Sequence, residues 1–343
     1  MQQERRKLVV FWEGTANTLN PLTTQIGLFS KVCRASAVES AKDVEGTHGP
    51  LKISFDGCGV THGNWGVLFA NGLDEQCQVV VEIVQKMNEC QAGSTTTGVH
   101  VVAVGLSRGG IACMKLARAL SKFPESQVTV STLLFDPVPG NAVSTGFPWT
   151  ACSAFDLSQC HNLKRVLALY PFEALPDIAM HAPTLGRYNP KTTLVQEDVT
   201  MGCHQGALLM PNIAPPGQHP EFSLRRILDY LECEGVSCSK LPVRLPTPHE
   251  CIDMMEYIKR RPPTETLRRK THDERRRKIL RHANAQTEWL NRHHEQLVRA
   301  LEMGNKTSTM GAVFGYPGSD DSGSYQLDFD DGYVLCPSPF TPK

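Results

Sequence analysis

VVAVGLSRGG, the sequence of residues 101–110, joins a run of small and β-branched apolar residues to a Gly-x-Ser-x-Gly pattern. Apolar residues then recur with helical spacing, at Ile111, Met114, Ala117 and Leu120. This order predicts a buried strand, a tight turn and a helix. In a nucleophile elbow the serine lies at the apex of such a turn, where flanking glycines permit strained backbone angles and leave room for a substrate. The stretch therefore predicts that Ser107 is a nucleophile, placed where the free N–H groups of the next helix favour developing negative charge.

Apolar stretches that predict strands alternate with helical patterns from residue 8 to residue 233. We expect strands at 8–12, 51–56, 99–104, 128–135, 163–170 and 193–201, and helices within 23–40 and at 74–88, 108–121 and 221–233. Such alternation favours a mostly parallel sheet covered on both faces, which binds ligands at the carboxyl ends of its strands. The predicted fold class is therefore α/β, a doubly wound sheet followed by a C-terminal helical extension.

Composition divides the chain into three parts. Of its 343 residues 41% are hydrophobic, which favours one large domain, the predicted catalytic domain, that spans residues 1–245. The formal net charge is zero, so no global attraction to nucleic acid is expected. After a Pro-Thr-Pro sequence, residues 246–303 predict a basic helical extension, and the Gly-, Ser- and Asp-rich residues 304–343 predict a disordered tail. Within the domain, residues 140–162 predict a long surface loop or a small lid.

Cysteine usage and the polar start of the chain indicate a cytoplasmic protein. The 12 cysteines are scattered without Cys-x-x-Cys pairs, and no apolar segment follows the polar first residues. No apolar run approaches the roughly 18 residues of a membrane span. Cys233 and Cys238 form at most half a zinc site, because no second Cys or His pair has matching spacing. We therefore predict neither a metal nor a cofactor.

A serine nucleophile needs a base that takes its proton and a carboxylate that orients this base. His204 follows the last predicted strand directly and has a glycine two residues away on either side, so we predict that it is the base. Two acids remain open. Asp136 comes directly after the strand that follows the elbow, whereas Asp177 follows the next strand region. Asp136 is favoured because its strand ends beside the elbow, although Asp before Pro also has a common structural use in turns.

An oxyanion hole requires two N–H donors directed at the charge that develops on a carbonyl oxygen. The backbone of Arg108, directly after the nucleophile, is predicted to supply one donor. An earlier loop should supply the other, and Gly14 and Thr15 follow the first strand. We expect the Arg108 side chain to pair with a carboxylate, with Glu13 as a candidate.

The helical extension is strongly basic. Between Lys259 and Arg299 there are thirteen Lys or Arg residues and five Asp or Glu residues. One interpretation is a solvated helix that docks on the core through a narrow apolar stripe. Another is peripheral contact of residues 258–303 with an anionic membrane. Nucleic acid is disfavoured because acidic residues are mixed into the basic run.

Several blocks together resemble a known group. Residues 9–17 (VVFWEGTAN) resemble the opening FDGTxN block of an uncharacterised α/β-hydrolase family that includes the catalytic domains of type VI secretion phospholipase effectors of the Tle kind. The DGCG, GLSRG, DPV and GCH blocks resemble later motifs of that family in the same order; they begin at residues 56, 105, 136 and 202. The resemblance covers about residues 8–238, and the arginine inside the elbow makes it more specific than a generic hydrolase match.

The resemblance implies an α/β-hydrolase-like fold with Ser107 as nucleophile, His204 as base and Asp136 as acid. Two blocks depart from the family pattern: Glu13 replaces an aspartate, and Gln-Gly-Ala-Leu follows His204 in place of Ser-Asp-Val-Gly-Gly. The membrane-docking insertions of the effectors are also missing.

These observations predict a serine hydrolase that cleaves a small-molecule or lipid carboxylic ester through an acyl-enzyme. The aromatic residues of the 140–160 loop, Phe147, Trp149 and Phe155, are candidates for the wall of an acyl pocket. The alternative is a weakly active or inactive binding or scaffold protein that keeps the hydrolase fold and acts through its basic helical arm.

Overall fold

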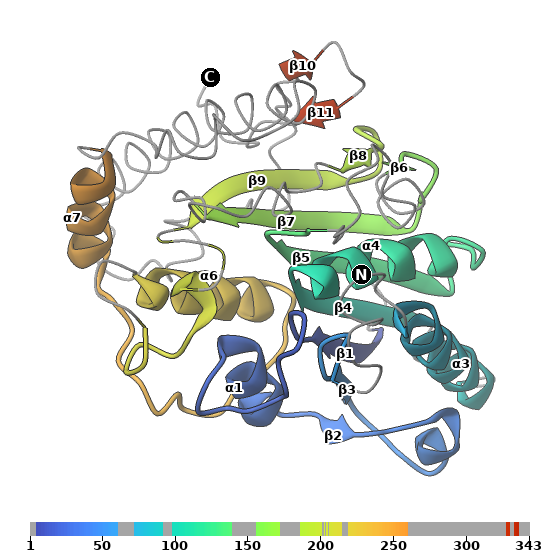
Figure 1. The fold of residues 1–343 in the computed structure, drawn as a ribbon. Helices are drawn as coiled ribbons and strands as arrows, with labels where there is room; N and C mark the ends of the chain where they lie inside the picture. Colours follow the sequence, from blue (N-terminus) through green and yellow to red (C-terminus); the bar gives the residue numbers. More distant parts are fainter. Residues whose placement is uncertain are drawn as a thin grey trace.

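A seven-stranded sheet with the order β2-β3-β1-β4-β5-β7-β9 forms the centre of the computed structural model (Figure 1). Each neighbouring pair in this sheet is parallel. The structure describes residues 5–60, 72–91, 98–138, 156–171, 186–200, 202, 204, 206–214, 219–259, 327–329 and 333–335. The strands of the sheet are β1 (Arg6–Trp12), β2 (Ser36–Ala37), β3 (Leu51–Phe55), β4 (Val99–Leu106), β5 (Val128–Phe135), β7 (Leu163–Pro171) and β9 (Leu194–Thr200).

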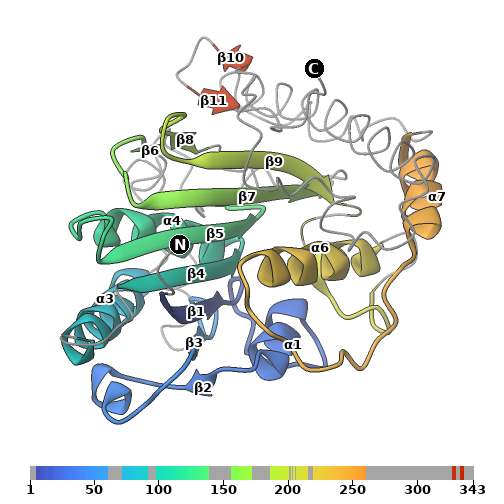
Figure 2. The same cartoon turned by 180° about the vertical axis from the view of Figure 1, so that it is seen from behind.

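Helices cover both faces of this sheet (Figures 1 and 2). Buried side chains of α3 and α4 pack with one set of alternate strand residues, such as Val10 and Val101. Those of α1 and α6 pack with the other set, such as Val9 and Val102. Two separate cores result because successive strand side chains point to opposite faces. The helices are α1 (Gln25–Val32), α3 (Leu73–Cys90), α4 (Arg108–Leu120), α6 (Pro220–Cys233) and α7 (Pro248–Lys259), with 3-10 turns η1 (Ala41–Val44) and η2 (Gly206–Leu208).

The strand order reverses direction at β1. The chain first builds β3 on one side of β1 and then crosses to add β4, β5, β7 and β9 on the other. The loops after β1 and β4 therefore diverge at the carboxyl edge of the sheet, which is where open α/β sheets form ligand crevices. Register pairs Trp12 with Gly105. Gly14 and Ser107 consequently each lie two residues beyond a paired position on neighbouring strands.

The α/β fold predicted from the sequence, a doubly wound and mostly parallel sheet, is confirmed. The predicted strand at 128–135 coincides with β5, and the elbow strand extends two residues beyond its predicted end, to Leu106. The sequence did not reveal β2, an edge strand of two exposed residues. Two further short strands, β6 (Asp156–Leu157) and β8 (Arg187–Tyr188), pair beside the main sheet.

The C-terminal parts are described only in pieces. Helix α7 corresponds to the first helical piece of the predicted extension, and the rest of that extension lies outside the described residues. The tail 304–343, predicted to be disordered, contains an antiparallel pair, β10 (Leu327–Phe329) and β11 (Tyr333–Leu335). Of the loop or lid predicted for residues 140–162, only 156–162 are described, and they begin with the short strand β6. The aromatic residues 147, 149 and 155 lie outside the described residues.

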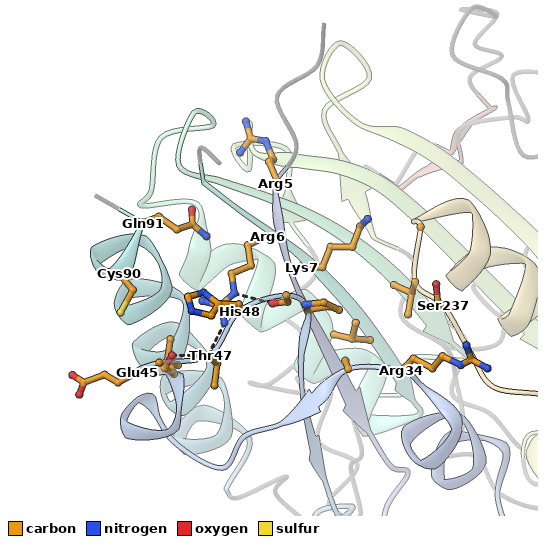
Figure 3. A pocket seen from close by; sticks show the side chains of 18 residues that line it. Arg5, Arg6, Lys7, Arg34, Glu45, Thr47, His48, Cys90, Gln91 and Ser237 are labelled. Carbon is orange, nitrogen blue, oxygen red and sulfur yellow. Dashed lines mark hydrogen bonds between the residues drawn. The ribbon is translucent and has the colours of Figure 1, made fainter. Parts of the chain in front are cut away.

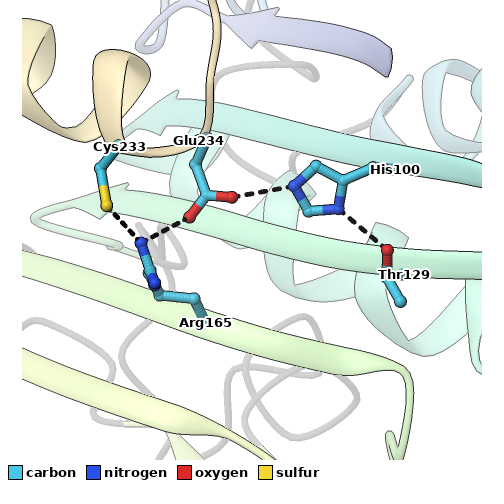
Figure 4. A network of polar contacts seen from close by, with 5 residues as sticks. All are labelled: His100, Thr129, Arg165, Cys233 and Glu234. Carbon is cyan, nitrogen blue, oxygen red and sulfur yellow. Dashed lines mark hydrogen bonds and ion pairs between the residues drawn. The ribbon is translucent and has the colours of Figure 1, made fainter. Parts of the chain in front are cut away.

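A buried ionic network fastens the end of α6 to the amino-terminal edge of the sheet (Figure 4). Glu234, the residue after α6, lies 2.8 Å from His100 Nε2 of β4 and 3.2 Å from Arg165 Nη1 of β7. His100 Nδ1 lies 2.9 Å from the hydroxyl of Thr129 on β5. Burial by itself would raise the pKa of the Glu234 carboxyl, but the hydrogen bond from His100 and the charges of His100 and Arg165 outweigh it and hold the pKa below its ordinary value. One carboxylate thus joins α6 to two strands of the sheet.

We predict that Glu234→Gln lowers the free energy of unfolding at pH 7 by roughly 1–3 kcal/mol, because a buried charge-assisted hydrogen bond is lost. The folded-state pKa of Glu234 lies below the ordinary value of 4.5, so this stabilisation is present above that pH and is lost as pH falls through the folded-state pKa. Urea denaturation of both proteins at pH 7 and pH 4 measures the difference. The exposed neighbour Glu232, changed to Gln, is the control and should differ from the parent by less than about 0.5 kcal/mol. A difference that does not shrink at low pH would contradict this role.

Candidate active site

Ser107 lies in a strained turn between β4 and α4. Its backbone angles are φ 57° and ψ −116°, and a non-glycine residue adopts a positive φ only where its surroundings impose it. Its N–H donates to the carbonyl of Phe135 at 2.8 Å, and its own carbonyl accepts from Val138 N–H at 3.3 Å. These two bonds attach the turn to the end of β5. The strand–turn–helix geometry expected of a nucleophile elbow is therefore present at Ser107.

The two glycines of the elbow are required by close backbone contact. A Cβ on Gly105 would lie 2.2 Å from the carbonyl oxygen of Gly109. A Cβ on Gly109 would lie 2.6 Å from the carbonyl oxygen of Trp12, the last residue of β1. Both distances are shorter than real Cβ contacts, so the first turn of α4 can lie against β1 and β4 only with glycine at these positions.

Asp136 and His204 are in direct contact. Asp136 Oδ2 lies 2.6 Å from His204 Nδ1, and the two residues are only 5% and 8% exposed. Asp136 follows β5 and is held there by a bond from its N–H to the carbonyl of Leu169, at 2.8 Å. His204 comes from the segment after β9, two residues beyond Gly202, whose φ is 92°. A carboxylate at Nδ1 fixes the imidazole and leaves Nε2 as the nitrogen that exchanges a proton.

The structure thus brings together residues that sequence analysis selected separately. Leu106 pairs in register with Phe135, so Ser107 and Asp136 are each the first residue beyond a paired position. The segment after β9 contributes His204 to the same edge of the sheet. Asp177, the other candidate acid, lies outside the described residues. The carboxylate in contact with His204 is that of Asp136.

The loop after β1 is tied firmly to its surroundings. Ala16 N–H donates to the carbonyl of Cys58 at 3.0 Å, and Gly57 N–H donates to that of Asn17 at 2.9 Å. A Cβ on Gly57 would lie 1.7 Å from the carbonyl oxygen of Gly14, so the loops after β1 and β3 touch backbone to backbone. This fixes the position of Gly14 and Thr15 relative to the loop after β3.

Arg108 and Glu13 do not form the pair suggested by the sequence. The Arg108 guanidinium donates to the hydroxyl of Thr15. Glu13 instead accepts from the hydroxyl of Thr24, the N-cap of α1, and from Gly14 N–H at 3.3 Å. The expectation of an Arg108–Glu13 ion pair is corrected, because Glu13 is only 1% exposed and turns towards the start of α1. Thr24, directly before a helical pattern, could have been recognised in the sequence as a helix N-cap. Nothing in the sequence indicated that it would bind Glu13, eleven residues earlier.

The pKa of the Glu13 carboxyl is raised. Desolvation by burial raises its pKa from 4.5 to about 7, against the opposing hydrogen bonds of Thr24 and Gly14. Its partners are neutral donors, which compensate a buried negative charge less than a cation does. The carboxyl beside the Gly14 N–H therefore titrates much closer to neutral pH than an ordinary Glu does.

Two N–H groups remain candidates for binding an oxyanion. The N–H of Arg108 belongs to the first turn of α4 and has no intrahelical acceptor. Within the described part of the chain, the N–H of Thr15 donates to no backbone carbonyl. Gly14 N–H donates to the Glu13 carboxyl. Of the two predicted donors after β1, Thr15 N–H is therefore the one more available to an oxyanion.

No metal site accompanies these residues in the described ranges: no three His, Cys, Asp or Glu side chains converge there in a way that would hold an ion. Over the same ranges, none of the helices has the length and apolar character needed to cross a bilayer.

The chain shows only distant similarity to known proteins. No family model matches it. No curated protein matches it either. Among solved structures it is similar to an uncharacterised protein from Pseudomonas aeruginosa, with 12% identity and a TM-score of 0.48 over 93% of this chain and 57% of that one. It is also similar to the Tle1 effector bound to the VgrG spike from the type VI secretion system, with 13% identity and a TM-score of 0.36 over 60% of this chain and 52% of that one.

The chain therefore spans little more than half the length of these two proteins. A third similar structure is the peroxisomal α/β-hydrolase Lpx1 from Saccharomyces cerevisiae, with 13% identity and a TM-score of 0.33 over 75% of this chain and 85% of that one. The assignment of the site rests on the geometry of this chain.

We predict that Glu13→Gln becomes more stable relative to the parent as pH rises. The pKa of Glu13 is about 7 in the folded protein, whereas in the unfolded chain it has the ordinary value of 4.5. The folded state therefore binds this proton more tightly than the unfolded state does, and the parent loses stability as pH rises from 4.5 to 7. The change in relative unfolding free energy from pH 4.5 to pH 8 should be roughly 3 kcal/mol, to within about a factor of two. Urea denaturation across this range measures it. The exposed Glu39, changed to Gln, is the control. A flat difference for Glu13→Gln would show that Glu13 ionises normally.

Proposed function

We propose that this protein is a serine hydrolase that cleaves carboxylic esters through an acyl-enzyme. The observation that carries the proposal is the 2.6 Å contact between Asp136 and His204 at the sheet edge where Ser107 occupies a strained elbow. An acid that orients an imidazole beside a strained serine is the arrangement by which hydroxyl nucleophiles are activated.

In the proposed mechanism, His204 Nε2 takes the hydroxyl proton as Ser107 Oγ attacks the ester carbonyl. Asp136 accepts the Nδ1–H bond and stabilises the imidazolium that forms. The N–H groups of Arg108 and Thr15 bind the oxyanion, assisted by Gly14 when Glu13 is protonated. The imidazolium then protonates the leaving alcohol, and water activated by the same nitrogen releases the acid from Ser107.

The surroundings of the site favour an apolar ester, a small molecule or a lipid. Leu22, Val60 and Ile213 are large apolar side chains with exposures of 74%, 38% and 45%. They lie in the segments after β1, β3 and β9, which all leave the carboxyl edge of the sheet. A cavity of about 570 Å³ beside Leu22 is lined by apolar residues that include Met210 and Val243 and by the charged Glu221, Arg244 and Glu250, but not by Ser107, Asp136 or His204. Exposed apolar residues in three segments that leave this edge of the sheet support binding of an apolar group there.

A second candidate is a weakly active or inactive binding protein with this fold. The observation that favours it is the Gly14 N–H, which donates to the Glu13 carboxyl and is thereby withdrawn from an oxyanion. Contact with an anionic membrane through residues 258–303 is a further proposal, and most of that segment lies outside the described residues. Turnover of a simple ester separates an enzyme from a scaffold.

We predict that the purified chain hydrolyses p-nitrophenyl butyrate above the buffer rate. Ser107→Ala and His204→Ala should abolish this activity, and Asp136→Asn should lower kcat by roughly 10²–10⁴-fold, because the imidazole loses its orienting acceptor. Release of p-nitrophenol, followed by absorbance, measures all four proteins. The exposed His161, changed to Ala, is the matched control and should keep full activity.

Asp177→Asn tests the other candidate acid and should leave kcat within about twofold. A large loss in Asp177→Asn with little effect of Asp136→Asn would contradict the assignment of the acid. Equal turnover by the parent and Ser107→Ala would contradict the proposed function itself.

A further inference from the structure

A second cavity lies around the amino-terminal end of β1 (Figure 3). It has a volume of about 960 Å³ and is lined by the start of β1, the turn at 44–50 before β3 and the turn at 235–237 after α6. Ser107, Asp136 and His204 all follow the carboxyl ends of parallel strands, whereas Arg6 is the first residue of β1. The cavity is therefore separate from the candidate active site, and it is called the basic pocket below.

The basic pocket is rich in unpaired positive charge. Its lining includes Arg5, Arg6, Lys7 and Arg34. Glu45 also lines it, but its carboxylate lies 2.5 Å from Lys86 Nζ and is neutralised there. Within the described ranges, no ion pair joins Arg5, Lys7 or Arg34 to a carboxylate. Cations that line one cavity without counter-charges attract an anion, because each one lowers the energy of negative charge near it.

Parts of the pocket are already ordered. Arg6 donates from Nε to the carbonyl of Gly49 at 2.8 Å and from Nη2 to the hydroxyl of Thr47 at 2.6 Å, which leaves other N–H groups of its guanidinium for a ligand. Arg5 Nη1 is buried and has no hydrogen-bond partner in the described part of the chain, and it lies close to Gly98, which is outside the pocket. A Cβ on Gly235 would lie 2.8 Å from Lys7 Nζ, so a glycine leaves room for this ammonium group.

We propose that the basic pocket binds an organic phosphate with more than one phosphoryl group, such as a nucleoside diphosphate. Guanidinium groups match the geometry of phosphate oxygens, and several cations call for more than one negative charge. Figure 3 shows Arg6 beside Thr47 and His48, and Lys7 and Arg34 on the other side of β1, which suits an extended anion better than a compact one. The volume is that of a small-molecule site, and Val44 and Val236 supply apolar wall for the organic part.

Isothermal titration calorimetry of the full chain with ADP, pyrophosphate and uncharged adenosine tests the proposal. We expect one saturable site for ADP, weaker binding of pyrophosphate and none of adenosine. The double variant Lys7→Gln/Arg34→Gln should weaken ADP binding at least tenfold. The control Lys31→Gln/Lys42→Gln removes two exposed lysines outside the pocket and should change the affinity by less than twofold. The single variant Arg34→Gln, at an exposed position, should weaken ADP binding about threefold. It replaces the double variant in the test if the double variant does not fold.

Sedimentation with phosphatidylcholine vesicles that contain phosphatidic acid distinguishes a lipid headgroup from a soluble phosphate. Vesicle binding that is lost in the pocket variant, without ADP binding, would keep the phosphate chemistry and assign it to a lipid. Absence of both kinds of binding at millimolar ligand would overturn the proposal. Equal loss in the pocket and control variants would also overturn it, because it would show only a general effect of charge.

Discussion

The close backbone contact of α4 with β1 and β4 is the constraint on which the candidate site depends. Gly109 lies against the carbonyl of Trp12, and Gly105 lies against the backbone of Gly109. This contact sets the first turn of α4 directly at the end of β4 and forces Ser107 into its positive-φ conformation. It also places the helix N-terminus beside the loop that follows β1. Sheet register then aligns the other strand ends, so the site follows from packing of the sheet and one helix.

Two buried carboxylates at opposite edges of the sheet have pKa values that are shifted in opposite directions. At the carboxyl edge, burial raises the pKa of Glu13 to about 7, because its partners Thr24 and Gly14 are neutral donors. At the amino edge, burial of Glu234 is outweighed by His100 and Arg165, and its pKa falls below the ordinary value. The identity of the donors thus decides the sign of the shift. An acid with a raised pKa lies beside the candidate oxyanion loop, and an acid with a lowered pKa holds α6 to the sheet.

Much of the fold and of the candidate site was predictable because it is local. Val101 to Gly110 encodes strand, turn and helix in one stretch, and Asp136 and His204 each follow a recognisable strand in the chain order of hydrolases. The unpredicted features are long-range. His100 and Glu234 are 134 positions apart, and each is an ordinary polar residue in its own segment. The inward turn of Glu13 and the basic pocket likewise depend on which segments the fold brings together. The two-residue strand β2 is too short for a periodic signal.

The proposed function requires Ser107 to be a nucleophile that His204 and Asp136 make reactive. Treatment of the folded chain with a fluorophosphonate, followed by intact-mass measurement and peptide mapping, tests this most directly. We expect a single adduct on Ser107, formed at least a hundredfold more slowly in His204→Ala. No adduct on the folded protein, or an adduct on another residue that persists in Ser107→Ala, would contradict it.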